Sequence, residues 1–313
     1  MYAYIIRRLI ATIPIMAIVA VFVFMLLHLS PGDPAAIIAG DFATEEQILK
    51  IREQLGLNDP LYIQFGSWLI NLLQGDMGQS IYSGLPVTKL IGQRLEPTLM
   101  LTLCTMLIAI TMAIPLGVIA AWKVGTWIDR AVMTLAVFGF SVPVFVIGYL
   151  LILGGSRTLG WFPVQGYTSI LESVPGFLSH ITLPALTLGA VYMALIARMT
   201  RATMLEVLNE DYVRTAYAKG LATRKVLVKH ALKNAMVPIS TTIGLGVALL
   251  IGGVVVTESV FAIPGLGRLT VDAVLRTDYP VIQGVILVFS FTYVLLNLLI
   301  DLSYLLFDPR IRY

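Results

Sequence analysis

Long apolar stretches dominate the pattern of hydrophobic and polar positions along this chain. Six of them carry no charged side chain, and they cover residues 9–27, 98–122, 131–156, 181–197, 234–257 and 279–300. A helix needs about 20 apolar residues to cross a bilayer, and the short fourth stretch gains length from the uncharged residues before it. The alternating pattern of barrel strands is absent, so the sequence predicts an all-α membrane protein with six transmembrane helices.

The first apolar stretch follows Arg7 and Arg8, as the core of a signal peptide would. Its apolar core is longer than the roughly 7–15 residues of a typical signal core, and no clean small-x-small cleavage site follows it. We therefore expect a retained anchor helix.

The basic residues predict the orientation of the chain. If both ends lie in the cytoplasm, 14 of the 21 Lys and Arg residues lie inside and 12 of the 18 acidic residues lie outside. The reverse topology would violate the positive-inside rule, so we expect cytoplasmic N and C termini. The predicted segments are 1–29 (tail and first transmembrane helix), 30–97 (periplasmic, with short helices) and 98–313 (a five-helix core that includes a cytoplasmic loop at 198–235).

The composition agrees with lipid as the main solvent of the chain. Hydrophobic residues make up 58% and charged residues 12%, whereas soluble domains have roughly 25% charged residues. The single cysteine, Cys104, lies in an apolar stretch, so we expect it to act as a small hydrophobic side chain.

The outward segment 30–97 predicts short helices that are broken by turns. Thr44 is a candidate N-cap, and Gly56 can close the helix that follows it. A turn signal at 58–60 precedes a further apolar-rich stretch at 61–73. The segment is longer than the topology requires, so we expect a docking platform for an external partner. A lipid-facing linker is the alternative.

The second long segment, 198–233, holds eight Lys or Arg residues. It predicts one helix over 205–219, stopped by Gly220, and a second helix capped by Thr223 that runs until Pro238 opens the fifth span. The alternative is a basic loop that only sets the topology and touches anionic lipid.

This segment carries a family resemblance. Residues 210–221 read EDYVRTAYAKGL and residues 230–235 read HALKNA. These motifs resemble the cytoplasmic coupling loop of ABC importer permeases. The general consensus of those permeases places Glu-Ala-Ala ahead of its glycine, whereas residues 214–216 read Arg-Thr-Ala. The motif as it stands here is similar to the variant found in the branch that imports dipeptides, oligopeptides, glutathione or nickel. It argues against amino-acid and sugar permeases.

Other motifs extend the resemblance over nearly the whole chain, in the order typical of that branch. They include PGDP at 31–34, LGL at 55–57, GDMG at 75–78, PGLGR at 264–268, DYP at 278–280 and DPRIRY at 308–313. The resemblance implies the architecture of a type I ABC importer permease, with the long first outward loop of the shorter permease subunit.

The resemblance also implies a five-part complex in the bacterial inner membrane. A homologous permease, two ATPase subunits that bind ATP and magnesium, and a periplasmic binding protein would join this chain. The implied cargo is a di- or oligopeptide or glutathione, and nickel or another small solute is the alternative. A stand-alone secondary transporter or channel is the alternative from a different class.

The chain lacks the Gly-x4-Gly-Lys-[Ser/Thr] phosphate loop. We therefore expect no enzyme activity and no cofactor in this chain, and no nucleic acid among its partners.

The expected contact with the ATPase subunits lies on one helical face. Tyr212, Thr215, Ala216 and Lys219 follow the i, i+3, i+4 and i+7 spacing. We expect this face to meet an ATPase, with Gly220 allowing close approach. The alternative is that Ala216 and Gly220 pack against the chain's own bundle. The full set of expected coupling residues is Tyr212, Arg214, Thr215, Ala216, Lys219, Gly220 and Leu221.

Small residues recur every four positions in the fifth span, at Gly244, Ala248 and Gly252. This spacing lets helices approach closely. We expect a seam with the partner permease, and packing inside one subunit is the alternative. Pro143 in the third span is a candidate kink.

Polar residues inside the spans are candidates for the transport path. Asn297 and Asp301 lie four residues apart in the sixth span, where an interhelical hydrogen bond is an equal alternative. Glu258, at the outer end of the fifth span, either meets the amino group of the substrate or sits at the membrane interface. The candidates are Ser141, Tyr149, Thr187, Glu258, Asn297 and Asp301.

Two histidines, His28 and His180, are the only hint of a nickel site, because both lie at the outer ends of spans. No further ligand is apparent in the sequence, so we expect no metal site.

Overall fold

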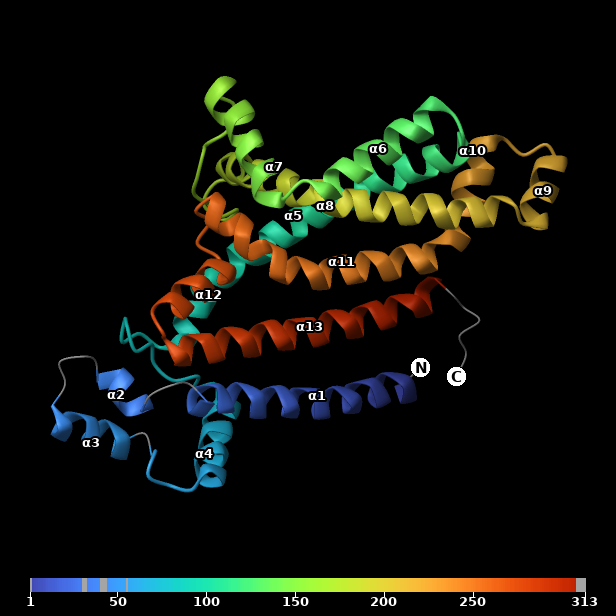
Figure 1. Ribbon diagram of the computed structural model, residues 1–313. Coiled ribbons are helices and arrows are strands. Elements are labelled where there is room, and N and C mark those ends of the chain that lie inside the picture. The colour runs from blue at the N-terminus through green and yellow to red at the C-terminus, as the bar shows by residue number, and fades with distance from the viewer. Residues whose placement is uncertain (1, 30–32, 40–43, 55, 308–313) are drawn as a thin grey trace. The chain divides into compact units, whose positions relative to one another are not determined.

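The computed structural model of the chain describes residues 2–29, 33–39, 44–54 and 56–307, which are mostly helical (Figure 1). The first helices are α1 (Tyr2–Leu29), α2 (Pro34–Ala39), α3 (Glu45–Gln54), α4 (Leu61–Leu73), α5 (Val87–Trp122), α6 (Trp127–Ser141) and α7 (Val144–Leu151). The remaining helices are α8 (Val174–Leu208), α9 (Asp211–Ala218), α10 (Thr223–Lys225), α11 (Lys233–Val260), α12 (Leu266–Leu275) and α13 (Tyr279–Phe307). Two π-helical stretches, Ile152–Thr158 and Val226–Leu232, continue α7 and α10.

The chain divides into two compact units. The larger unit, unit 1, contains Glu96–Arg268 and the end of α13 from Leu295. Unit 2 contains Ile6–Leu95 and Leu269–Val294.

Five helical segments are long and apolar enough to cross a membrane, and their bounds are Ile10–Leu29, Val87–Trp122, Val174–Leu208, Thr223–Leu250 and Tyr279–Ile300. A sixth span results if the bent pair of α6 and α7 counts as one. Each predicted apolar stretch therefore falls on a helix or on this pair.

The third predicted span is not one continuous helix. Its two halves, Trp127–Ser141 and Val144–Thr158, meet at an angle of 104°. Val142 between them is extended, and Pro143 stands immediately before α7. Proline has no N–H to donate and disfavours helical geometry in the residue before it, so the helix ends here. This confirms Pro143 as a break, sharper than the predicted kink.

Helix α8 is longer than the predicted fourth span. Its 35 residues measure about 50 Å at about 1.5 Å per residue, against roughly 30 Å of hydrocarbon. The helix therefore continues past the membrane, and residues 198–204, predicted as the start of a loop, are helical.

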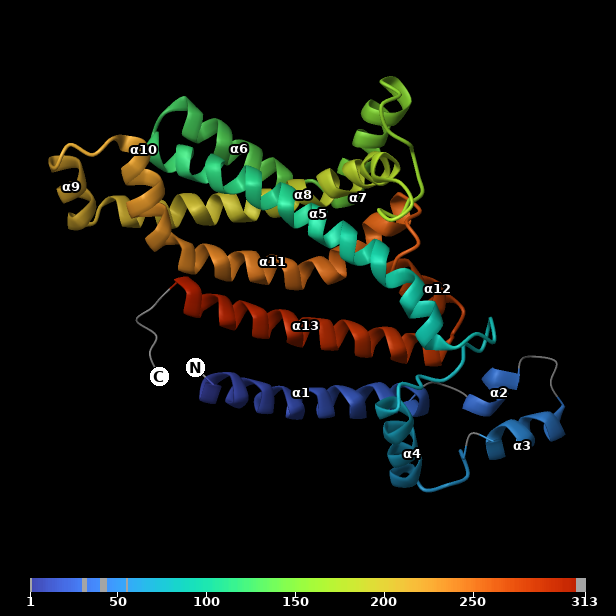
Figure 2. The same cartoon turned by 180° about the vertical axis from the view of Figure 1, so that it is seen from behind.

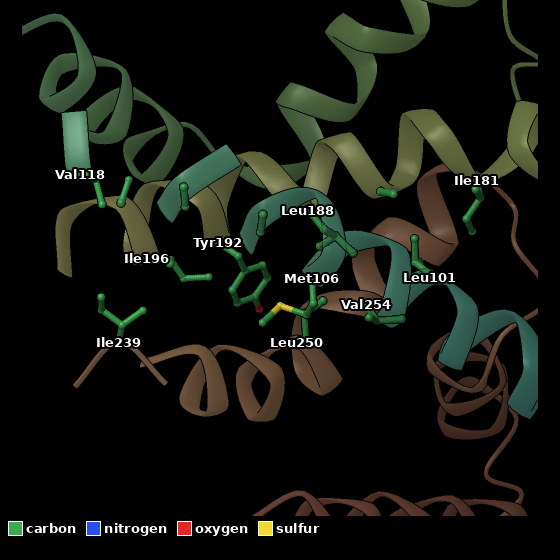
Figure 3. Packing of buried hydrophobic residues seen from close by; sticks show 14 of the residues in the cluster. Leu101, Met106, Val118, Ile181, Leu188, Tyr192, Ile196, Ile239, Leu250 and Val254 are labelled. Carbon is green, nitrogen blue, oxygen red and sulfur yellow. The ribbon is translucent and has the colours of Figure 1, made fainter. Parts of the chain in front are cut away.

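The core of unit 1 lies where α5, α8 and α11 meet. Figure 3 shows Met106 from α5, Tyr192 from α8 and Leu250 from α11 side by side in this core. A Cβ added to Gly117 of α5 would lie 2.6 Å from the Cβ of Thr200 in α8. Gly117 therefore serves close helix packing, for which no larger residue leaves room.

Unit 2 confirms the predicted helix starts and ends in the outward segment. The hydroxyl of Thr44 accepts from the N–H of Gln47 at 3.4 Å, and the side chain of Gln47 accepts from the N–H of Thr44 at 2.9 Å. This reciprocal pair is a capping box at the start of α3. Gly56 has a positive φ of 64° after the helix, and α4 occupies residues 61–73 as predicted.

Candidate functional site in the cytoplasmic hairpin and the helix core

A short hairpin joins α8 to α11. Asn209 ends α8, and α9 then runs from Asp211 to Ala218. The helix predicted over 205–219 is thus two helices, with a break at Asn209. Figures 1 and 2 show α9 at the far end of α8, seen from two sides.

A small hydrophobic cluster holds α9 against its own hairpin. Val213 and Ala216 are buried with Val226 of the π-helical stretch. The half-buried side chains packed against this cluster are Val207, Leu208 and Leu221. Ala216 and Leu221, two of the expected coupling residues, therefore contact other residues of this hairpin.

The opposite side of α9 remains open to solvent. Tyr212 is 41% exposed, and its hydroxyl accepts from the Nδ2 of Asn234 at 2.8 Å. Thr215 and Lys219 are also exposed. The predicted face is therefore divided, because Ala216 points inward while the other three residues point outward.

Gly220 follows the C-cap of α9 and has a positive φ of 75°. A glycine adopts this left-handed conformation without steric cost, and it is the usual residue at this position after a helix. A Cβ added at Gly220 would meet no heavy atom of the described chain within 4 Å. The left-handed backbone conformation thus explains why a glycine stands at this position, and the prediction that Gly220 ends the helix is confirmed.

The predicted cap of the second hairpin helix is wrong. Thr223 is the first residue of α10, and Ala222 occupies the N-cap position without a side-chain hydrogen bond. Pro238 does not open the fifth span, since α11 begins at Lys233 and contains it. Pro238 is the sixth residue of α11, and prolines inside transmembrane helices are tolerated because neighbouring helices and hydroxyl side chains can satisfy the carbonyl that loses its N–H donor.

A buried ion pair joins α6 to α8, and the sequence interpretation missed it. Asp129 is 5% exposed, and Arg201 approaches it with two nitrogens, Nε at 2.5 Å from Oδ1 and Nη2 at 2.8 Å from Oδ2. The N–H of Gly125 donates to the same carboxylate at 3.0 Å. The pair ties the start of α6 to the C-terminal part of α8.

Glu258 is fully buried and binds groups of its own unit. Its Oε1 accepts from the hydroxyl of Thr98 at 2.6 Å, and its Oε2 accepts from the N–H of Arg268 at 2.9 Å. The hydroxyl of Thr98 in turn accepts from the N–H of Leu266 at 2.8 Å. A Cβ on Gly265 would overlap the carboxylate. Glu258 therefore holds the start of α12, and this arrangement favours a structural role over contact with the substrate.

The other path candidates lie on four helices. Thr187 is buried in α8 and donates to the carbonyl of Leu183 at 2.8 Å, so its hydroxyl is used within its own helix. Ser141 and Tyr149 are exposed on either side of the break between α6 and α7. Asn297 is half-buried in α13, and the side chain of Asp301 lies outside the described residues.

The small-residue face of α11 has a contact inside the chain. A Cβ on Gly244 would overlap the side chain of Ile300 in α13. At this position the structure favours packing inside one subunit. Ala248 is half-buried, and the surroundings of Gly252 lie outside the described residues.

The two histidines of the nickel hint have protein partners. The Nε2 of His28 lies 3.0 Å from the Oε1 of Gln64. The Nδ1 of His180 lies 2.8 Å from the carbonyl oxygen of Gly176. Within the described parts of the chain, no group of three or more His, Cys, Asp or Glu side chains is placed to hold a metal ion.

Long apolar helices with a structured hairpin beyond them define a multi-pass membrane protein. The chain belongs to the family of binding-protein-dependent transport system inner membrane components, whose main domain matches residues 113–313 and whose N-terminal domain matches residues 1–102. It is a permease subunit of an ATP-driven importer in a bacterial inner membrane.

Curated relatives match the chain from end to end. A probable peptide ABC transporter permease of Sinorhizobium fredii is 54% identical over 313 residues, which is all of both chains. A putative peptide transport system permease of Brucella abortus is 46% identical, and a glutathione transport system permease of Escherichia coli is 47% identical, again over both full lengths.

The fold is shared with a solved importer. The inward-facing MetNI methionine ABC transporter contains a chain that matches with a TM-score of 0.59 and 17% identity, covering 70% of this chain and 96% of that chain. At this identity the likeness shows the fold, which is that of a type I ABC importer permease.

Proposed function

We propose that this chain forms, with a homologous permease, the path for di- or oligopeptides or glutathione that a periplasmic binding protein delivers. The proposed substrate class is supported by the full-length similarity to permeases named for peptide and glutathione transport. Two ATPase subunits would bind ATP and magnesium and drive the cycle, because this chain has no phosphate loop of its own.

The substrate proposal is tested by uptake into proteoliposomes that hold the complete complex and its binding protein. We expect ATP-dependent accumulation of a labelled dipeptide, oligopeptide or glutathione, and no accumulation with a non-hydrolysable ATP analogue. Accumulation of nickel alone would contradict the proposed cargo. Uphill uptake by this chain without any ATPase would contradict the whole mechanism.

We propose that α9 transmits the movement of an ATPase to the membrane helices. Its inner side rests on the Val213–Ala216–Val226 cluster, and its outer side presents Tyr212 and Thr215. A helix held in this way can be pushed as a unit, since the hydrogen bond between Tyr212 and Asn234 couples it directly to the first turn of α11. The outer set is Tyr212, Arg214, Thr215 and Lys219, and Gly220 supplies the turn after it.

The coupling proposal predicts a large effect of a bulky residue on the outer side of α9. Thr215→Trp keeps the buried cluster intact, so we expect the chain to insert normally but to lose ATP-driven uptake at least tenfold. Lys229→Trp is the matched control, because Lys229 is also an exposed residue of the hairpin but lies outside α9. Co-purification of the ATPases measures docking. Normal docking of the ATPases together with normal uptake in Thr215→Trp would contradict the proposal.

We propose Ser141, Tyr149, Asn297 and Asp301 as the remaining candidates for the path. Ser141 and Tyr149 are both exposed polar residues close to the Pro143 break in the bent span. Reaction of cysteines at these positions with a small aqueous thiol reagent would distinguish path-lining from lipid-facing side chains.

A further inference from the structure

Helix α4 is an uncharged helix in the outward segment. Its 13 residues, LYIQFGSWLINLL, contain no Asp, Glu, Lys or Arg, and none of them is buried. Together with most of α1 it belongs to unit 2, so the packing of α4 on α1 is internal to one unit.

Aromatic side chains attach α4 to the outer end of α1. The ring of Phe24 in α1 lies 5.3 Å from the ring of Phe65 and 5.7 Å from the ring of Trp68, measured between centroids. Gln64 of α4 also meets His28 of α1, with 3.0 Å between Oε1 and Nε2. One side of α4, around Phe65 and Trp68, is thereby covered by α1.

This contact fixes the depth of α4 in the membrane. The apolar span of α1 ends at Leu29, five residues after Phe24, which corresponds to about 7–8 Å at 1.5 Å per residue. Figures 1 and 2 both show α4 running across α1. A helix that crosses a transmembrane helix at this depth lies in the plane of the membrane, within the roughly 5–10 Å to which interfacial helices insert.

A second side of α4 is apolar and uncovered. At about 100° per residue, Tyr62, Ile63, Ile70 and Leu73 form a continuous arc beside the side that packs on α1. They are 75%, 42%, 56% and 79% exposed, respectively. Ser67 falls outside this arc.

The remaining side of α4 is polar, with Ser67 and Asn71 both exposed. The neighbouring helix α3 is very different, because it carries charges that pair with one another in solvent, as Lys50 does with Glu46 at 3.0 Å. Two helices of one outward segment are thus suited to two solvents.

We propose that α4 is an interfacial helix that inserts the arc of Tyr62, Ile63, Ile70 and Leu73 into the outer leaflet of the membrane. Helix α1, on which α4 packs, also carries exposed apolar residues such as Phe22, as a transmembrane helix does. A soluble partner needs about one hydrogen bond per 100–200 Å² of interface, and in this arc only the hydroxyl of Tyr62 supplies a side-chain group. Lipid therefore fits the arc better than a protein does.

The test uses the complete complex in lipid nanodiscs, with Cys104→Ala removing the native thiol. Single cysteines at Ile70, Asn71 and Leu49 carry a nitroxide spin label, and collisions with oxygen and with a water-soluble nickel chelate are measured. At Ile70 we expect the label to collide severalfold more often with oxygen than with the nickel chelate. At Asn71 we expect collisions with the nickel chelate to be more frequent. Leu49 is the matched control, an exposed leucine on the charged helix α3 (60% exposed), and we expect it to behave like Asn71.

Three outcomes would overturn the proposal. The first is a label at Ile70 that the nickel chelate reaches as readily as the label at Leu49, which would put the arc in water. The second is a label shielded from both reagents, which would show that protein covers the arc. The third is a label that becomes shielded when the binding protein is added, which would make the arc a docking surface. Ile70 lies on the uncovered side of α4, so the substitution removes no contact with α1.

Discussion

Among the described residues of unit 1, two carboxylates are buried, one at each end of the helix core, and they have different hydrogen-bond partners. Asp129 meets the guanidinium of Arg201 in a two-point ion pair. Glu258 accepts from the hydroxyl of Thr98 and from the N–H of Arg268 in the first turn of α12. The first carboxylate thus has a formal positive charge beside it, and the second has a hydroxyl and a helix N-terminus.

The two ends of the core should therefore respond differently when one partner is removed. Removing one partner of a buried ion pair is strongly destabilising, because the other charge stays buried and unpaired. A cluster of hydrogen bonds can lose one bond and keep the rest. Three substitutions test this contrast.

Arg201→Ala should lower the free energy of unfolding by about 3–5 kcal/mol, since it leaves Asp129 buried without its partner. The measurement is unfolding of the purified chain in mixed micelles by increasing SDS. The double variant Asp129→Ala/Arg201→Ala is the control, and we expect it to be more stable than Arg201→Ala alone. A double variant less stable than the single one would show that the charge is not the source of the loss.

Thr98→Val should lower the free energy of unfolding by about 2–3 kcal/mol. The substitution removes a hydroxyl that donates to Glu258 and accepts from Leu266, so two buried groups each lose a partner. Thr187→Val is the matched control, because the hydroxyl of Thr187 bonds only a carbonyl of its own helix, and we expect a loss of less than about 1 kcal/mol there. Equal losses in the two variants would argue against the cluster.

Glu258→Gln should have the smallest effect, about 1 kcal/mol, because the amide oxygen can still accept one of the two hydrogen bonds. Glu258→Leu, which removes both acceptor oxygens, is the comparison. We expect uptake to survive in Glu258→Gln, since we assign this residue to the start of α12. Loss of uptake with an unchanged free energy of unfolding would show instead that Glu258 contributes to the substrate path.

Much of the fold was predictable because its signals are local. The capping box at Thr44 and the glycine after α3 need only neighbouring residues, and the apolar stretch 61–73 coincides with α4. Pro143 marked the break in the third span by the same kind of local constraint, although the 104° angle did not follow from it.

The candidate site was less predictable, because its residues meet across long separations. Helical spacing put Ala216 on a face with Tyr212, but the buried side of α9 is set by Val226, which belongs to the returning half of the hairpin. Likewise, Asp129 and Arg201 are 72 positions apart, and no pattern within one helix could pair them.

The solvent of each segment follows from the amino-acid sequence alone, because the free energy of placing a side chain in lipid or water depends on that side chain and its near neighbours. The sequence thereby determined the helices, the family resemblance and the location of the cytoplasmic hairpin. Which polar groups form hydrogen bonds inside the protein, in contrast, depends on how the helices pack. Thr98 and Glu258 lie 160 positions apart, and their roles follow from the packing that brings them together.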